Sequence, residues 1–438
     1  MFDKLFRRGK KKEEAPEPLI PFGRYSDNNK PVEKVNRWTE ADNLFKQKNY
    51  PESLDAFFNY LSDDELGNVS YQRSGSDGRF SLYQGSKIVR GDFNAERLTA
   101  EVTLAKMPQP SVPVMRRLLE MNFNLYYSRF ALDGDRLCMR FDSDMTATAP
   151  SKLYYGLKEL ATRADKQDDL LVQDFAALQM IDTEHVQPIP AAEKEVKYAF
   201  FRKWIQEVLD QCAGLDPEKF AGGISYMLLS LIYRLDYLIS PEGQLLRELE
   251  KTGTIYFAKD ERPATEKNRD MIESFKLILA RSKEEVFACL FRSKYTFAIV
   301  PPQPHKVISD AIHAANQNMP WYRENGNPFV AGQVTEYGLA FCQYSYSLPR
   351  ILTELFHLYM RVSYAGYFEA LGFRNKLYDE ASTTFDREKI VAELEAIRER
   401  WKSKYPNAVV NPDNLRFDNL VNFGQTFATE FEFLNMES

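Results

Sequence analysis

The sequence predicts an α+β protein in which one antiparallel-sheet unit occurs twice. Stretches that alternate apolar and polar residues are interleaved with stretches of helical spacing. Short motifs recur at a constant offset along the chain, and apolar helices lie between the two sets. Each unit is expected to have the order α-β-β-β-α-β-β-α, with a helical linker region joining the copies. The expected divisions are a charged flexible leader (1–30), a helical hairpin plus the first α+β domain (31–175), a helical connector (176–260), the second α+β domain (261–375), and a C-terminal helix and tail (376–438).

The composition indicates a globular chain with no nucleic-acid partner. Of 438 residues, 44% are hydrophobic and 13% aromatic, which suffices for large cores. Lys and Arg number 57 against 63 Asp and Glu, for a net charge of -6, whereas phosphate binding needs a basic surface. The four cysteines form no CxxC pair and no export-type apolar run follows the N-terminus, so we expect a cytoplasmic protein without disulfides.

The leader has two interpretations. Apolar Met1, Phe2, Leu5 and Phe6 precede a basic run at positions 7–12. The segment is either a solvated tail or a short amphipathic anchor that makes weak contact with an anionic membrane or an acidic partner.

The first unit is expected to begin with a helical hairpin. Residues 37–61 have helical spacing that is broken at Pro51, and they resemble one tetratricopeptide unit. Because a single such unit cannot bury its apolar faces alone, it should dock on the next domain. The following elements are expected to be strands 79–90 and 98–107, helix 112–121, a hairpin of 126–132 and 136–141 around Asp133-Gly134-Asp135, and a closing helix 151–164.

The second unit is predicted from the repeat. Pro108-Gln109-Pro110 recurs as Pro302-Gln303-Pro304, and Asn122 and Asn124 recur as Asn316 and Asn318 at the same offset. The expected elements are helix 265–280, strands 285–291 and 294–300, helix 306–316, a hairpin of 329–334 and 338–346, and helix 348–371. Helices 193–212 and 220–239 should join the halves, and a charged helix 386–404 should follow the second unit.

Motifs for chemistry are weak. There is no GxGxxG, GxxxxGK[ST] or GxSxG, and the loop at Gly85 resembles a phosphate loop only superficially. Glu354 and His357 have the spacing of one half of a carboxylate-bridged iron site, but that chemistry needs the motif from two helices. We therefore expect no catalytic residue, cofactor or metal.

Residues 98–145 resemble the YbjN branch of the bacterial type III secretion chaperone-like fold. The shared features are the helix VMRRLLEMN ending at Asn122, a strand through Phe130 and Leu132, and the turn Asp133-Gly134-Asp135. The resemblance extends over about residues 79–164. It implies dimeric packing, binding of extended or partly unfolded protein segments, and no catalytic residues.

The predicted function is that of a non-enzymatic, chaperone- or adaptor-like protein. Sheet edges and aromatic grooves around Tyr126, Tyr127, Tyr295 and Phe297 would accept a strand or helix from a protein partner. The two copies would pair within one chain as a pseudo-dimer, or the chain would form a homodimer. A structural subunit of a larger bacterial assembly is the alternative, and an enzyme with a site between the two halves is the least expected function.

Overall fold

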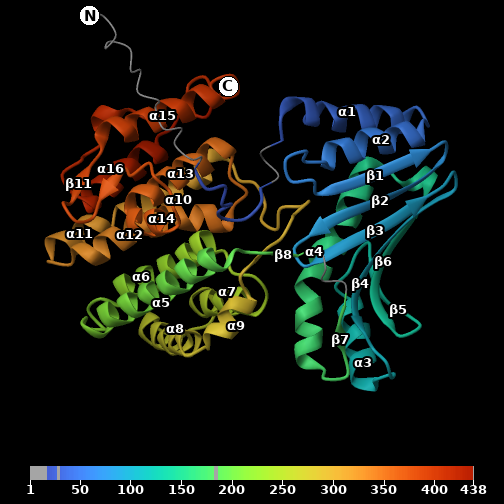
Figure 1. Cartoon of the computed structure of the whole chain (residues 1–438), viewed down its shortest axis with the longest axis horizontal. Helices are drawn as coiled ribbons and strands as arrows, with labels where there is room; N and C mark the ends of the chain where they lie inside the picture. The colour runs from blue at the N-terminus through green and yellow to red at the C-terminus, as the bar shows by residue number, and fades with distance from the viewer. Residues whose placement is uncertain (1–16, 27–29, 182–185, 438) are drawn as a thin grey trace, which may run out of the picture.

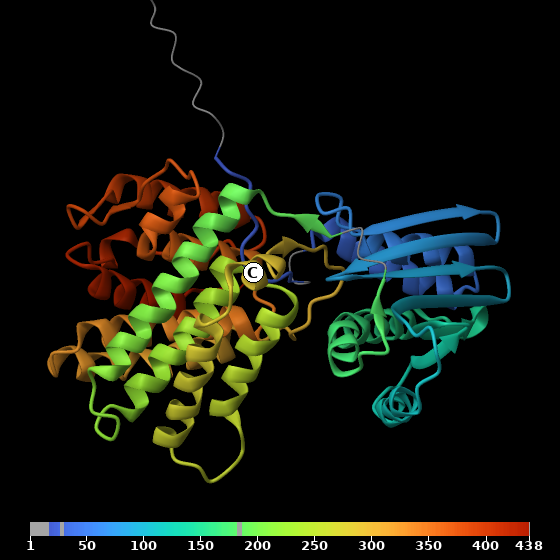
Figure 2. The same cartoon turned by 60° about the horizontal axis from the view of Figure 1, so that its bottom comes forward.

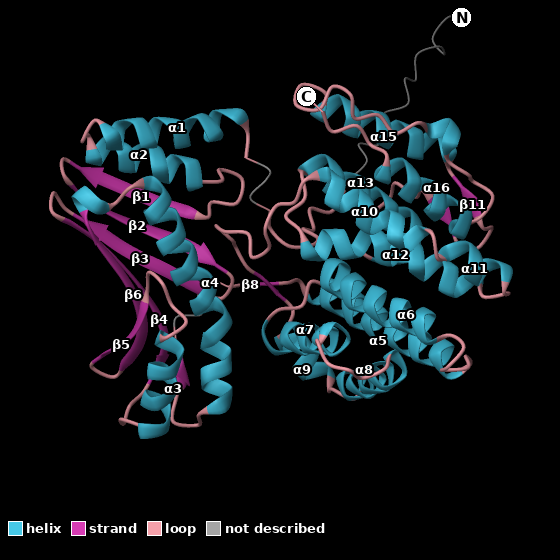
Figure 3. Ribbon diagram, turned by 180° about the vertical axis from the view of Figure 1, so that it is seen from behind, coloured by secondary structure: helices cyan, strands magenta, loops and turns pink. Residues whose placement is uncertain are grey.

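The protein consists of a sheet domain and a helical domain. The computed structural model describes residues 17–26, 30–181 and 186–437. Residues 30–181 form the sheet domain and residues 186–437 the helical domain (Figure 1). Nearly all strand residues lie in the first half, as Figure 3 shows. The predicted α+β class is therefore confirmed for the whole chain.

The sheet domain begins with two helices and ends with a long one. Its elements are α1 (Val32–Lys46), α2 (Tyr50–Leu61), β1 (Val69–Ser74), β2 (Asp77–Gln84), β3 (Lys87–Phe93), β4 (Arg97–Lys106), α3 (Val112–Asn122), β5 (Arg129–Asp133), β6 (Arg136–Asp144), the 3-10 turn η2 (Met145–Ala147), α4 (Pro150–Asp174) and β7 (Gln179–Met180). Four strands precede α3, whereas only strands 79–90 and 98–107 were expected there. Strand β1 was not predicted, and the expected strand 79–90 is two strands, β2 and β3.

A tight turn at Gly85 divides that stretch. Gly85 has a φ of +55°, and a β-carbon there would lie 2.0 Å from the Asp165 carboxylate of α4. The same carboxylate accepts a hydrogen bond from the Ser86 amide (2.8 Å). The loop that resembles a phosphate loop is thus a hairpin turn that already binds a carboxylate of the protein.

The sheet has helices on one face and charged side chains on the other. Its strand order is β1-β2-β3-β4-β6-β5, all antiparallel, with β7 added beside β4. Helices α1, α2 and α4 cover one face (Figure 2). The predicted docking of the helical hairpin is confirmed, since Trp38 packs on Tyr154 (5.8 Å between rings) and Phe58 on Tyr71 (4.7 Å). On the other face Glu101 lies between Arg90 and Arg140.

The helical domain is built around α6 and α12. Its elements are β8 (Gln187–Pro188), α5 (Ala191–Ala213), α6 (Ala221–Arg234), the π-helix η3 (Leu235–Ile239), α7 (Gly243–Phe257), α8 (Ala264–Leu279), α9 (Lys283–Ala288), β9 (Phe291–Arg292), α10 (His305–Asn316), α11 (Met319–Glu324), α12 (Pro328–Ser345), α13 (Arg350–Ser363), α14 (Ala365–Ala370), β10 (Tyr378–Asp379), β11 (Thr384–Phe385), α15 (Arg387–Trp401), η4 (Pro412–Asn414) and α16 (Leu420–Glu432). Among the described helices, none is long and apolar enough to cross a bilayer.

The predicted second sheet unit is wrong. The expected hairpin 329–334 and 338–346 is the single helix α12, and the expected strand 285–291 is mostly α9. Helix α10 and the pair α13–α14 do lie where helices were expected. Because the two halves differ in architecture over the residues that the structure describes, the duplicated unit, and with it the pseudo-dimer within the chain, is not found there. The expected connector 176–260 belongs instead to the core of the helical domain.

Each domain packs against a segment from the other half of the chain. Residues 17–26, which precede the sheet domain, lie on the helical domain, where the Gly23 amide donates to the Tyr237 carbonyl (3.0 Å) and Arg24 pairs with Asp236 (2.6 Å). In return, Phe297 from the helical half lies in the core of the sheet domain. The Gln84 side chain accepts from the amides of Thr296 (3.2 Å) and Phe297 (3.0 Å).

Candidate protein-docking surface

Helix α3 has apolar residues on two faces. Val114 and Leu118 point inward and are buried. Val112, Leu119 and Phe123 point outward and are 73%, 64% and 92% exposed. A surface helix normally carries polar residues on its outer side, so the second apolar stripe sets α3 apart from an ordinary surface helix.

The outward stripe continues into the loop that follows α3. Tyr126 in this loop is 91% exposed. The stripe has the spacing of successive helical turns, with Arg116 between Val112 and Leu119. We refer to Val112, Arg116, Leu119, Phe123 and Tyr126 as the α3 face.

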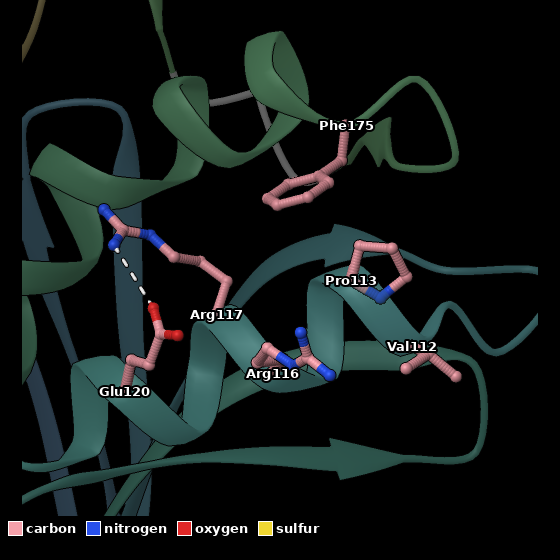
Figure 4. A pocket seen from close by; sticks show the side chains of 6 residues that line it. All are labelled: Val112, Pro113, Arg116, Arg117, Glu120 and Phe175. Carbon is pink, nitrogen blue, oxygen red and sulfur yellow. Dashed lines mark ion pairs between the residues drawn. The ribbon is translucent and has the colours of Figure 1, made fainter.

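A hollow of about 330 Å³ adjoins the first turns of α3. Figure 4 shows Phe175, which follows α4, pointing toward α3 across this hollow, with Arg117 extending toward the ribbon above. Arg117 makes an ion pair with Glu120 at 3.8 Å, and both side chains are largely exposed. The lining residues are Val112, Pro113, Arg116, Arg117, Glu120 and Phe175. An apolar surface with guanidinium groups beside it is thus open to solvent.

Glu159 of α4 fixes the loop that carries Tyr126 and Tyr127. Its carboxylate accepts hydrogen bonds from the amides of Tyr126 (2.8 Å), Tyr127 (2.9 Å) and Ser128 (2.8 Å). Burial alone would raise the pKa of this carboxyl, but the amide hydrogen bonds outweigh burial and lower it. The two tyrosines therefore project from a backbone that is held in place.

The four predicted partner-binding residues have different environments. Tyr126 and Tyr127 are exposed, at 91% and 41%. Phe297 is fully buried and packs on Tyr154, so its ring cannot contact a partner. The Tyr295 hydroxyl donates to Glu242 (2.6 Å), and burial raises its pKa. Of the four, the structure leaves Tyr126 and Tyr127 available for docking.

Sequence reasoning missed the most exposed residues of this surface. Leu119 belongs to the predicted helix 112–121, and Phe123 lies two residues beyond its predicted end. The signal was present, because the same helix has a second apolar stripe at a different angle. Only the structure shows that one stripe is buried and the other is not.

The two edges of the sheet differ in accessibility. At the β5 edge, the Asn122 side chain accepts from the Phe130 amide (2.8 Å), which closes part of that edge. At the other edge, the backbone amide of Tyr83 in β2 donates to the Asn68 carbonyl. By the register of the two strands, the even-numbered residues of β1 therefore form the hydrogen bonds to β2. The backbone groups of Val69, Tyr71 and Arg73 point away from the sheet. Within the described part of the chain, no backbone hydrogen bond reaches these outward groups.

Glu354 and His357, which have the spacing of half an iron site, contact different partners. The Glu354 carboxylate accepts from the Trp401 indole (3.1 Å), while His357 lies at 3.2 Å from the Tyr237 hydroxyl, so the two do not form a joint site. Burial raises the pKa of Cys138 to about 11 and of Cys342 to about 12. In residues 17–26, 30–181 and 186–437, no three His, Cys, Asp or Glu side chains are grouped as metal ligands.

No family model matches the chain, and a search of curated proteins finds no significant match.

Proposed function

We propose that this chain is a protein-binding protein, chaperone- or adaptor-like, that holds its partner on the α3 face. The observation that carries the proposal is the exposure of Leu119 and Phe123 on a helix that is already anchored by its other face. The resemblance of residues 79–164 to the YbjN branch supports the same class, and we place the activity in the cytoplasm.

The energetics favour a binding role for this surface. Burying an exposed Val, Leu or Phe side chain contributes about 1.5 to 3 kcal/mol, so covering Val112, Leu119 and Phe123 would offset part of the free-energy cost of association. The Glu159 anchor lowers the ordering cost, because the loop with Tyr126 and Tyr127 is fixed before the partner arrives.

The β1 edge offers a second mode of contact. Val69, Tyr71 and Arg73 present their backbone groups in the pattern that an added antiparallel strand needs. A partner with one helix and one extended segment would use both surfaces of the same domain. A homodimer and a place in a larger bacterial assembly are alternatives that would bury the α3 face against a different occupant.

Photo-crosslinking at Phe123 tests the proposal. A photoreactive phenylalanine analogue at position 123 is compared with the same analogue at Leu277, which is 74% exposed on α8 of the helical domain. We expect position 123 to give a discrete protein adduct in cells that carry the native gene, and position 277 to give none. Light scattering of the purified chain then separates a partner from a second copy. Equal labelling at both positions would reject the α3 face as a docking surface.

A further inference from the structure

We propose that the helical domain has a binding site for an extended protein segment with an aromatic residue, a glycine and an arginine in succession. Residues 17–26, which we call the N-terminal strap, fill this site as a tethered ligand, and a protein partner that presents the same three residues displaces them. The site lies on the helical domain and the α3 face on the sheet domain, so the inference goes beyond the proposed function.

The site is built where η3 ends. Pro241 has no amide hydrogen, so it cannot donate to the Tyr237 carbonyl four residues earlier. Besides the Ser240 hydroxyl (2.9 Å), the Gly23 amide of the strap donates to that carbonyl (3.0 Å). Gly23 has a φ of +72°, and a β-carbon there would lie 2.6 Å from the Tyr237 ring. The site therefore selects glycine at this position.

A buried carboxylate selects the arginine. Arg24 donates through Nε (2.8 Å) and Nη2 (2.6 Å) to one oxygen of Asp236, whose side chain is 7% exposed. The Arg24 Nη1 donates to Glu250 (3.3 Å), and the guanidinium lies 4.8 Å from the centre of the Tyr344 ring. Three donors in one rigid plane suit arginine and not lysine. Because a buried carboxylate without a partner is costly, the strap leaves when another guanidinium takes its place.

A cluster of rings receives the residue before the glycine. The Phe22 ring lies 5.2 Å from that of His357 and 5.3 Å from that of Phe368. Phe368 also packs on His357 (5.5 Å) and on Phe373 (5.3 Å), so the cluster has contacts of its own within the helical domain. These contacts keep the site in shape for a new occupant, which lowers the cost of binding.

The strap is placed to compete with a free ligand. It precedes α1 in sequence, and the next described residue, Lys30, already donates to the Leu61 carbonyl of the sheet domain (3.3 Å). Replacing the strap therefore changes one short segment and leaves the strands and helices of both domains in place. A tethered ligand has a high effective concentration, so a partner binds more weakly to the intact chain than to the open site.

A synthetic peptide with the sequence of residues 17–26 tests the inference against the full chain. Fluorescence anisotropy measures its affinity for the wild type, for Phe22→Ala with Arg24→Ala, and for Gly23→Ala, which loosens the strap through a different contact. Further peptides carry Arg24→Lys, Gly23→Ala or Leu19→Ala, or keep Phe22, Gly23 and Arg24 with serine at every other position. Leu19→Ala is the matched control, because Leu19 is 95% exposed. Circular dichroism checks that each protein variant is folded.

Both strap variants should bind the peptide about tenfold or more tightly than the wild type does, because the wild-type strap competes. The Arg24→Lys and Gly23→Ala peptides should bind about tenfold or more weakly, and the Leu19→Ala peptide equally well. The peptide with serine at the other positions should still displace the original one. Absence of binding to both folded strap variants would overturn the inference, as would equal affinity of the Arg24→Lys peptide.

A second copy of the chain is the competing occupant. The hydroxyl oxygens of Ser26 and Ser347 lie 2.7 Å apart. A disulfide between a Ser26→Cys copy and a separate Ser347→Cys copy, formed as readily as in the double variant, would show exchange of the strap between copies and reject the protein partner. Leu119→Asp with Phe123→Asp should leave peptide binding unchanged, so this test and the crosslinking at position 123 succeed or fail independently.

Discussion

His357 of α13 illustrates how burial decides the chemistry of a single side chain. Its ring lies among Phe22, Phe368 and the Tyr237 hydroxyl. Burial, and secondarily the charge of Arg361, lowers the pKa of His357 to about 3. The imidazole is therefore neutral in the folded protein at physiological pH, and it acts as a packed hydrogen-bonding ring.

We predict that His357 makes the fold sensitive to acid. Below a pH of about 6.5 the unfolded chain binds a proton at this residue and the folded chain does not, so stability is lost as the pH falls from about 6.5 toward 3. At pH 5 the loss amounts to about 2 kcal/mol. Urea unfolding of the wild type and of His357→Gln at pH 7 and pH 5 checks this. The variant should lose less stability between the two pH values, and an unchanged difference would contradict the role of His357.

At the scale of elements, α6 and α12 are joined by a buried ion pair. The Arg234 guanidinium donates to both Glu336 oxygens (2.8 and 3.0 Å) and lies 4.6 Å from the centre of the Tyr364 ring. Both side chains are almost completely buried. Glu336 falls between the two strands that the sequence predicted, and its burial depends on the helical form of α12.

Removing one partner of this pair should be far more costly than removing both. Glu336→Ala leaves the Arg234 charge buried without a partner, and we expect a loss of about 3 to 5 kcal/mol in unfolding free energy. Arg234→Met combined with Glu336→Leu keeps the volume apolar and should cost much less. Chemical denaturation of the three proteins measures the difference. Equal losses in the single and double variants would show that the pair is not a coupled unit.

The register of β1 predicts a position-dependent response to proline. Proline at Val69 removes an amide that points outward, whereas proline at Ser70 removes a hydrogen bond to Ser81. We expect Ser70→Pro to lower the melting temperature clearly and Val69→Pro to change it little. Thermal unfolding followed by circular dichroism compares the two. A larger effect at position 69 would mean that the outward groups of β1 are already paired.

At the scale of the whole molecule, the exchanged segments make the two domains depend on each other. Residues 17–26 bring Phe22 against Phe368 and Phe373 of the helical domain. Residues 293–298 bring Phe297 into the core of the sheet domain. Each domain therefore lacks part of its packing when the other unfolds, and one cooperative transition is expected.

Phe297→Ala should separate that transition into two. The lost ring leaves a cavity in the sheet domain that costs about 3 to 5 kcal/mol, although the mutation lies in the helical half of the sequence. Differential scanning calorimetry should show one peak for the wild type and two for the variant, with the sheet domain unfolding first. Ile299→Ala is the matched control, because Ile299 is 53% exposed two residues further on. A single peak that shifts as a whole would show that the two domains remain fully coupled.

Local signals were sufficient for much of the sheet domain. The helical hairpin was predicted from its spacing and Pro51, and the β5–β6 hairpin from Asp133-Gly134-Asp135, where Gly134 has a φ of +62°. In both cases the decisive interactions lie within a few residues of each other. The division of the expected strand 79–90 into β2 and β3 was missed because the turn at Gly85 depends on the distant carboxylate of Asp165.

The sequence by itself determined the composition of the protein, the helices with one apolar stripe, and the turns that need special backbone angles. The tertiary structure alone decided that residues 329–346 form a helix, since a segment buried on most sides is apolar in every periodicity. It also decided which apolar stripe of α3 remains exposed. Burial depends on neighbours from distant parts of the chain, and no local pattern specifies those neighbours.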